Sequence, residues 1–140
     1  MIQNKVFLDT SYSIAGAVGK DEFNKRAREL ATQIRTKGIE IITTQAIVLE
    51  IGNALSKLKY RQSATKIIDS LESDLNTTII SLTPELYAEG FELFRNRPDK
   101  EWGLVDCISF VVMRERNIEA ALTADEHFIQ AGFRALLRED

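Results

Sequence analysis

The sequence predicts an α/β protein: a three-layer α/β/α sandwich with a mostly parallel central sheet. Short apolar or β-branched runs alternate along the chain with longer segments whose apolar residues recur at helical spacing. Because each right-handed crossover returns the chain in the same direction, this alternation favours parallel strands covered by helices on both faces. The length of 140 residues, with 44% hydrophobic and 28% charged residues, is typical of one globular domain, which we expect to span residues 1–140.

The first half of the chain contains two predicted strands and three helices. Residues 5–8 form a short apolar run that ends at a cluster of helix-starting residues, which predicts a strand followed by a helix. Apolar residues at helical spacing over 23–34 predict a second helix, and Gly38 supplies its stop before a strand at 39–42. The apolar face of residues 47–58 then predicts a third helix, which carries Glu50.

The second half repeats the alternation. The expected elements are a helix at 64–71, a strand at 77–80, a helix opened by Thr83 and Pro84, a helix at 104–116, a strand at 118–123, a short terminal helix and an edge strand at 133–137. No internal repeat, linker or low-complexity tract interrupts the sequence.

Composition excludes several kinds of site. Cys107 is the only cysteine, so the chain can form neither an intramolecular disulfide nor a thiolate metal cluster. His127 is the only histidine, which removes His-rich zinc sites. The sequence has no apolar run long enough for a membrane span and no leader pattern, so we expect a cytoplasmic protein. The net charge of -3 requires cations and local basic patches if the partner is a nucleic acid.

Four acidic residues are the candidates for chemistry. Asp9 and Asp125 directly follow predicted strands, and Glu50 and Asp106 lie on predicted helices. In a parallel sheet, such positions can converge beyond the carboxyl ends of the strands. Clustered carboxylates repel one another unless hard cations bind them, which favours Mg²⁺ or Mn²⁺. Two such ions about 3.5–4 Å apart can activate water and stabilise the leaving oxygen of a phosphodiester without histidine or cysteine.

Each acid also has a structural interpretation. Asp9 and Asp125 are placed to cap the helices that follow them. Glu50 is compatible with a solvated helix surface, although its neighbours are apolar or small, and Asp106 is compatible with a helix N-terminal acid stabilised by the dipole.

The four acidic segments together resemble the motifs of PIN-domain proteins, in the same order. The matching segments are Phe7-Leu8-Asp9-Thr10-Ser11, the Glu50 helix, Trp102-Gly103-Leu104-Val105-Asp106-Cys107 and Leu122-Thr123-Ala124-Asp125. The resemblance covers nearly the whole chain and is closest to the toxin ribonucleases of VapBC toxin–antitoxin pairs. It implies a PIN-like fold, a metal-dependent endoribonuclease, and Asp9, Glu50, Asp106 and Asp125 as catalytic metal ligands, with Thr10 or Ser11 offering a hydroxyl.

The same resemblance implies protein partners as well as an RNA substrate. We expect a cognate antitoxin to dock on surplus apolar surface of the helices at 47–58 and 64–71, and two copies of the chain to pair through neighbouring helices as a homodimer.

Other residues are interpreted structurally. Asp99 suits a turn, His127 suits hydrogen bonding or packing, and Trp102 suits an anchor at the core edge rather than a base-stacking platform. Two basic groups could rim the acidic site and bind phosphates; they are Lys57, Lys59, Arg61 and Lys66, which we favour, and Arg95, Arg97 and Lys100.

Three alternatives compete with this hypothesis. A haloacid-dehalogenase-like phosphatase needs a second aspartate where Ser11 stands, and a receiver-type domain needs an acceptor aspartate that residues 79–81 do not supply. A catalytically silent PIN-like module that binds RNA or protein remains as the non-enzyme alternative, and metal-dependent cleavage distinguishes it.

Overall fold

The computed structural model describes residues 4–140, in which five strands alternate with seven α-helices. The elements are β1 (Lys5–Leu8), α1 (Thr10–Ala17), α2 (Asn24–Lys37), β2 (Glu40–Thr44), α3 (Gln45–Ala54), α4 (Leu58–Ser73), β3 (Thr77–Ile80), α5 (Pro84–Asn96), α6 (Leu104–Glu115), β4 (Ala120–Leu122), α7 (Glu126–Gln130), β5 (Arg134–Ala135) and a final 3₁₀ turn, η1 (Leu136–Arg138).

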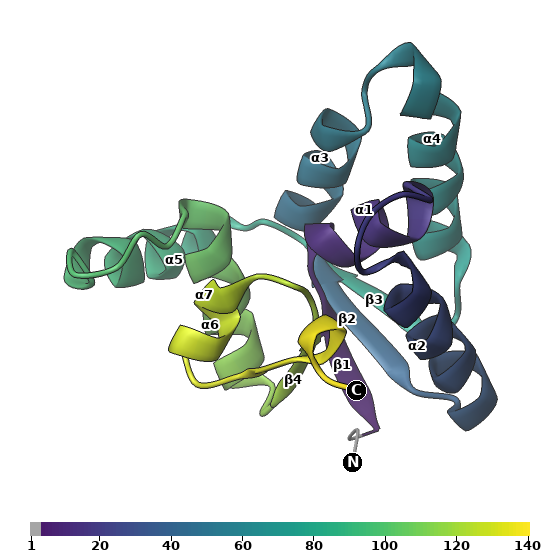
Figure 1. The fold of residues 1–140 in the computed structure, drawn as a ribbon. Coiled ribbons are helices and arrows are strands. Elements are labelled where there is room, and N and C mark those ends of the chain that lie inside the picture. Colours follow the sequence, from purple (N-terminus) through teal and green to yellow (C-terminus); the bar gives the residue numbers. More distant parts are fainter. Residues whose placement is uncertain (1–3) are drawn as a thin grey trace.

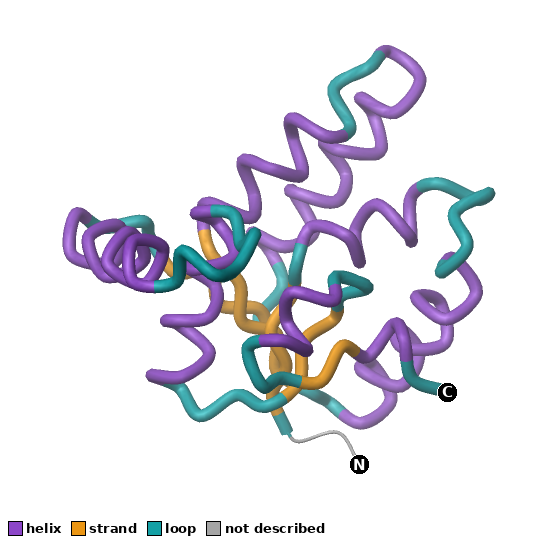
Figure 2. Tube along the Cα trace, turned by 60° about the vertical axis from the view of Figure 1, so that its left-hand side comes forward, coloured by secondary structure: helices purple, strands orange, loops and turns teal. Residues whose placement is uncertain are grey.

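The sheet confirms the predicted architecture. Its strand order is β3-β2-β1-β4-β5 and all four pairings are parallel. Helices α1, α2 and α4 lie to one side of the strands and α5, α6 and α7 to the other (Figure 1). The strands therefore form the middle of three layers, as the tube view also shows (Figure 2).

Alternating side chains of β1 build the core on both faces of the sheet. Phe7 is fully buried, and its ring centroid lies 6.4 Å from that of Phe128 in α7, which in turn lies 4.9 Å from Phe110 of α6. Leu8, the next residue, points to the opposite face, where it borders a groove with Tyr12 of α1. This alternation is what a strand covered on both sides requires.

The predicted helix over 47–58 is wrong at its end. Helix α3 stops at Ala54, Leu55 is its buried C-cap, and Leu58 begins α4 with 94% of its surface exposed. Helices α3 and α4 form a hairpin that projects from the sheet (Figure 2). The intervening turn contains neither glycine nor proline, so periodicity alone extended the helix through it.

The C-terminal strands are shorter than predicted. Strand β4 covers only Ala120–Leu122, and β5 only Arg134–Ala135 before the 3₁₀ turn begins. Leu136 and Leu137 are both buried, and the Leu137 amide donates to the Thr123 carbonyl at 3.1 Å. Both leucines therefore belong to the 3₁₀ turn and not to β5.

The topology determines where a site can form. The sheet extends from β1 in both directions, because β1 has β2 as its neighbour on one side and β4 on the other. The carboxyl ends of β1 and β4 therefore flank the point at which the strand order reverses, where open α/β sheets bind their ligands. Asp9 follows β1 at this point, and Thr123 follows β4.

Across residues 4–140, no helix has both the length and the apolar character that crossing a membrane requires.

Candidate active site

Asp9 occupies the deepest position of the candidate site. It is 6% exposed, and its Oδ2 accepts hydrogen bonds from the hydroxyls of Thr123 at 2.7 Å and Ser11 at 3.1 Å. Burial raises the pKa of Asp9 to about 6 against the lowering effect of the Thr123 hydrogen bond, and the nearby charge of Asp106 raises it further. A carboxylate held this way favours a cation beside it, since the cation compensates the lost solvation.

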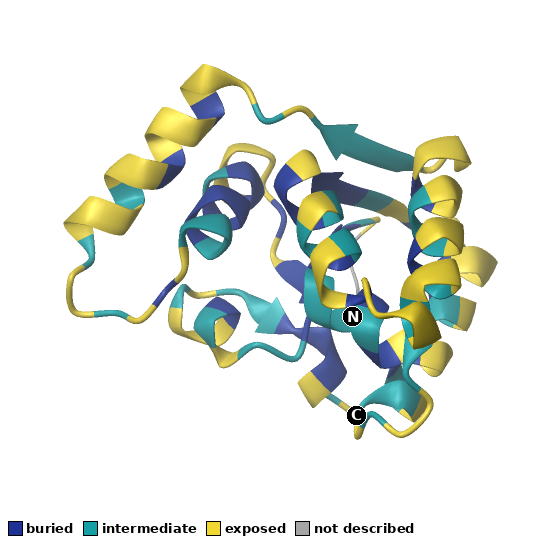
Figure 3. Cartoon of the chain, turned by 90° about the horizontal axis from the view of Figure 1, so that it is seen from above, coloured by how far each residue is buried: buried dark blue, intermediate teal, exposed yellow. Residues whose placement is uncertain are grey.

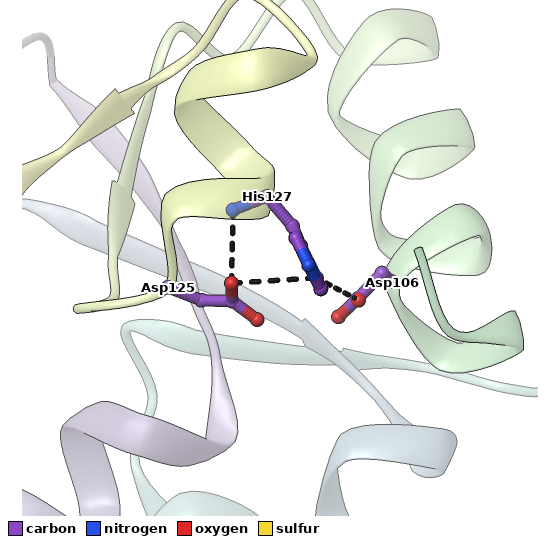
Figure 4. A group of neighbouring side chains, drawn as sticks. All are labelled: Asp106, Asp125 and His127. Carbon is purple, nitrogen blue, oxygen red and sulfur yellow. Dashed lines mark hydrogen bonds and ion pairs between the residues drawn. The ribbon is translucent and has the colours of Figure 1, made fainter. Parts of the chain in front are cut away.

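Asp106, Asp125 and His127 form a second group at the same edge of the sheet. Asp106 lies in the first turn of α6, where its Oδ2 accepts from the Gly103 amide at 3.0 Å. Asp125 is the N-cap of α7, and its Oδ1 accepts from the His127 amide at 2.9 Å. The imidazole of His127 lies between the two carboxylates, with Nδ1 3.1 Å from Asp106 Oδ2 and 3.4 Å from Asp125 Oδ1 (Figure 4).

The charges in this group shift one another's pKa values. Burial is the main reason why the pKa of Asp106 is raised, and hydrogen bonds from Gly103 and His127 oppose it. Burial alone would lower the pKa of His127, but the hydrogen bond to Asp106 and the charge of Asp125 outweigh it and raise that pKa.

Glu50 reaches the site from α3. Thr10, the first residue of α1, donates its hydroxyl to Glu50 Oε1 at 2.6 Å. This bond supplies the partner that an acid among apolar neighbours requires. The hydroxyls of Thr10 and Ser11 thus contact carboxylates, whereas the sequence suggested them as groups for water or phosphate.

All four predicted acids line one open cleft of about 660 Å³. We call it the acidic cleft, and its lining residues are Asp9, Thr10, Ser11, Ile14, Glu50, Asn53, Ala54, Asp106, Asp125 and His127. The ligand atoms of Asp106, Asp125 and His127 lie within 4.8 Å of one another, close enough to share one ion. Carboxylate oxygens with an imidazole nitrogen form a donor set that fits a divalent cation.

Two of the acids have a structural role at a helix start and also line the acidic cleft. Asp125 caps α7, as the structural interpretation expected, and its side chain also faces the cleft. Asp106 bonds to the backbone at the start of α6, as a helix N-terminal acid does, and also contacts His127. Capping and site roles are therefore compatible for these residues.

Sequence reasoning missed two residues of the site. Thr123 is fully buried and contacts Asp9, but a threonine at the end of a strand carries no distinctive signal. The sequence predicts a hydrogen-bonding or packing role for His127, and the structure shows hydrogen bonding; the place of its ring between two acids does not follow from the sequence. Its position two residues after Asp125 at a helix start was the available clue.

Two residues outside the cleft have the structural roles predicted for them. Trp102 is 4% exposed and donates from Nε1 to Gln130 at 3.0 Å, so its ring is unavailable for base stacking. Asp99 accepts two 3.0 Å hydrogen bonds from Arg97, and this ion pair lowers the pKa of Asp99 to about 2.

The fold and the acidic cleft define a class of α/β protein in which carboxylates meet at the switch point of a parallel sheet, in a donor set suited to divalent cations. The sequence profile of the PIN domain matches residues 6–134, so the chain belongs to the PIN-domain family. This result confirms the resemblance seen in the sequence.

A solved structure shows the same fold. The protein is similar to the crystal structure of Mycobacterium tuberculosis VapC20, a toxin that cleaves the sarcin-ricin loop, with a TM-score of 0.81. The two sequences are 23% identical, and the match covers 91% of this chain and 95% of VapC20. Comparison with curated protein sequences gave no match.

Proposed function

We propose that this protein is a divalent-metal-dependent endoribonuclease and the toxin of a VapBC-type toxin–antitoxin pair, acting in the cytoplasm. The observation that carries the proposal is the gathering of all four predicted acids in one cleft. Membership of the PIN-domain family and the fold shared with an RNA-cleaving toxin support it. The catalytic residues of the proposal are Asp9, Glu50, Asp106 and Asp125.

The acids of the cleft would hold Mg²⁺ or Mn²⁺. A divalent cation bound there supplies positive charge to the phosphodiester and makes an attacking water more acidic. Thr123 and Ser11 fix the carboxylate of Asp9, and Thr10 fixes that of Glu50, so the ligand oxygens are oriented before the cation arrives.

Cleavage of RNA by the purified protein tests this proposal. We expect a structured RNA to be cut with Mg²⁺ or Mn²⁺ and left intact with excess EDTA. RNA that is bound but remains whole with either metal would support the alternative of a silent binding module. Undiminished cleavage in EDTA would contradict the metal mechanism.

The basic residues at the tip of the α3–α4 hairpin are the better candidates for holding RNA phosphates. Asn53 and Ala54 of α3 line the acidic cleft, and the chain continues from them to Lys57 and into α4. The alternative group is partly neutralised, because Arg97 and Lys100 both pair with Asp99. Phosphate contacts at the hairpin would position RNA without selecting its sequence.

An antitoxin segment would dock in a groove between α1, α2 and α4. This groove of about 830 Å³ is lined by residues that include Tyr12, Ala31 and Ile67 and the basic residues Arg28 and Lys66. The sequence predicts a docking surface on the helices at 47–58 and 64–71. Residues of α4 line the groove, whereas residues of α3 do not. An Ala31→Arg substitution should abolish neutralisation by the antitoxin while RNA cleavage persists, and retained neutralisation would contradict this docking site.

The homodimer would form through the outer face of α5. Tyr87, Phe91 and Phe94 are 48%, 38% and 44% exposed, and their neighbouring rings lie 6.3 Å apart. Exposed residues cover most of α5 (Figure 3). An aromatic stripe of this kind is typical of interface cores rather than of free surface.

A further inference from the structure

We propose that His127 is a direct nitrogen ligand of the cation in the acidic cleft, and that it makes the site prefer a first-row transition metal, with Mn²⁺ as the probe, over Mg²⁺. This inference rests on the proposed metal-dependent function and specifies the ligand set of that site. It assigns His127 a role that composition and motif order did not indicate.

The position of the imidazole carries the proposal. Nδ1 lies 3.1 Å from Asp106 Oδ2 and 3.4 Å from Asp125 Oδ1 (Figure 4). Ligands that meet a metal ion at right angles, with bonds of about 2.1 Å, lie about 3 Å apart. The two distances from Nδ1 are therefore those of adjacent ligands in one coordination sphere, and ligand atoms of Asp106, Asp125 and His127 all lie within 4.8 Å of one another.

The surrounding structure keeps the imidazole in this position. Phe128, the next residue, is fully buried against Phe7 and Phe110, which anchors α7 to the core. The amide of His127 donates to the same Asp125 oxygen that its ring approaches. Because backbone and neighbouring side chain are both fixed, the ring faces the cleft without a separate ordering step.

A nitrogen ligand changes which metal binds. Mg²⁺ prefers an all-oxygen octahedral set and keeps several waters, whereas imidazole binds transition metals more readily. Replacing one oxygen ligand by His127 nitrogen therefore favours Mn²⁺. A histidine that only positioned Asp106 through a hydrogen bond would leave the coordination sphere entirely of oxygen.

Electron spin echo envelope modulation of the Mn²⁺-loaded, untagged protein distinguishes these roles. Because the chain contains a single histidine, labelling with ¹⁵N-histidine assigns any imidazole signal to His127. We expect ¹⁴N modulation that changes to ¹⁵N modulation on labelling and disappears in His127→Gln. By calorimetry, the preference for Mn²⁺ over Mg²⁺ should fall about tenfold in His127→Gln, with circular dichroism confirming that it is folded.

The outcomes separate this inference from the proposed function. Mn²⁺ that binds the wild type, supports RNA cleavage and shows no histidine modulation would overturn the role of His127 alone. If Mn²⁺ does not bind the wild type, the metal-dependent function fails together with this inference.

Discussion

Thr123 donates a buried 2.7 Å hydrogen bond from its hydroxyl to Asp9 Oδ2, and this bond joins the ends of β4 and β1. The same hydroxyl oxygen accepts from the Asp125 amide at 3.0 Å. Thr123 thus links two acids of the cleft that are far apart in the sequence. Its proposed role is one of positioning, because its contacts are to two of the proposed ligand residues.

Replacing Thr123 by valine keeps the shape of the side chain but removes the donor. We expect the free energy of unfolding to fall by about 1–3 kcal/mol, because the buried Asp9 Oδ2 loses one of its two hydroxyl donors. The rate of RNA cleavage should fall by about tenfold, since the Asp9 carboxylate is no longer oriented. Thr123→Ser is the matched control, and equal losses in both variants would argue against the hydroxyl.

The stability of the metal-free protein should decrease as the pH rises from about 4 to about 6. Asp9 has a pKa of about 6 in the folded chain against 3.8 ordinarily, so the folded state binds the proton more tightly. Loss of that proton at higher pH costs about 3 kcal/mol of stability. The raised pKa of Asp106 acts in the same direction.

Denaturant unfolding in EDTA at pH 4.5 and pH 7 measures this effect against an Asp9→Asn control. The variant should be the more stable protein at pH 7, and the difference in unfolding free energy between the two proteins should narrow at pH 4.5. A wild type that gains stability relative to Asp9→Asn as the pH rises would contradict the raised pKa.

Gly90 allows α5 to pack against α6. A Cβ added at this position would lie 2.5 Å from Cγ1 of Ile108 and 3.3 Å from its Cα. Because the backbone cannot yield cheaply there, Gly90→Ala should destabilise the protein by about 1–3 kcal/mol. At Gly52 the nearest atom would be 3.9 Å away, so Gly52→Ala should be neutral or stabilising through helix propensity. Similar thermal midpoints for the two variants would refute this account of α5 packing.

Phe91 should determine whether the chain forms a dimer. Light scattering after size exclusion should give a dimer for the wild type and a monomer for Phe91→Ser, since serine removes the centre of the aromatic stripe. Leu75→Ser is the control, because Leu75 is 101% exposed at the turn before β3. A monomeric wild type, or a Phe91→Ser variant that still dimerises, would exclude α5 as the interface.

The sequence allowed the layers of the fold and the order of their elements to be predicted because apolar periodicity reports which faces are buried. It could not locate the end of α3, since Leu58 has the right spacing for the apolar face but lies exposed after an unmarked turn. The sequence also predicted a longer β5 than the structure has, because the burial of Leu136 and Leu137 depends on packing rather than on strand periodicity.

The acids of the site could be predicted because each followed a strand or stood among apolar residues. The residues that hold these acids in place could not be predicted, because their contacts join segments that are far apart in the sequence. Thr123 and Asp9 are 114 positions apart and meet only when β4 pairs with β1. His127 and Asp106 likewise meet only when α7 packs beside α6.

RNA cleavage by Asp125→Asn tests the central claim most directly. Asparagine caps helices as well as aspartate does, so α7 and the fold should be retained while one ligand charge is lost. With saturating Mn²⁺, we predict that a folded Asp125→Asn protein cleaves RNA more than about a hundredfold slower than the wild type. Wild-type turnover by this variant would contradict the proposal that the acidic cleft is the catalytic metal site.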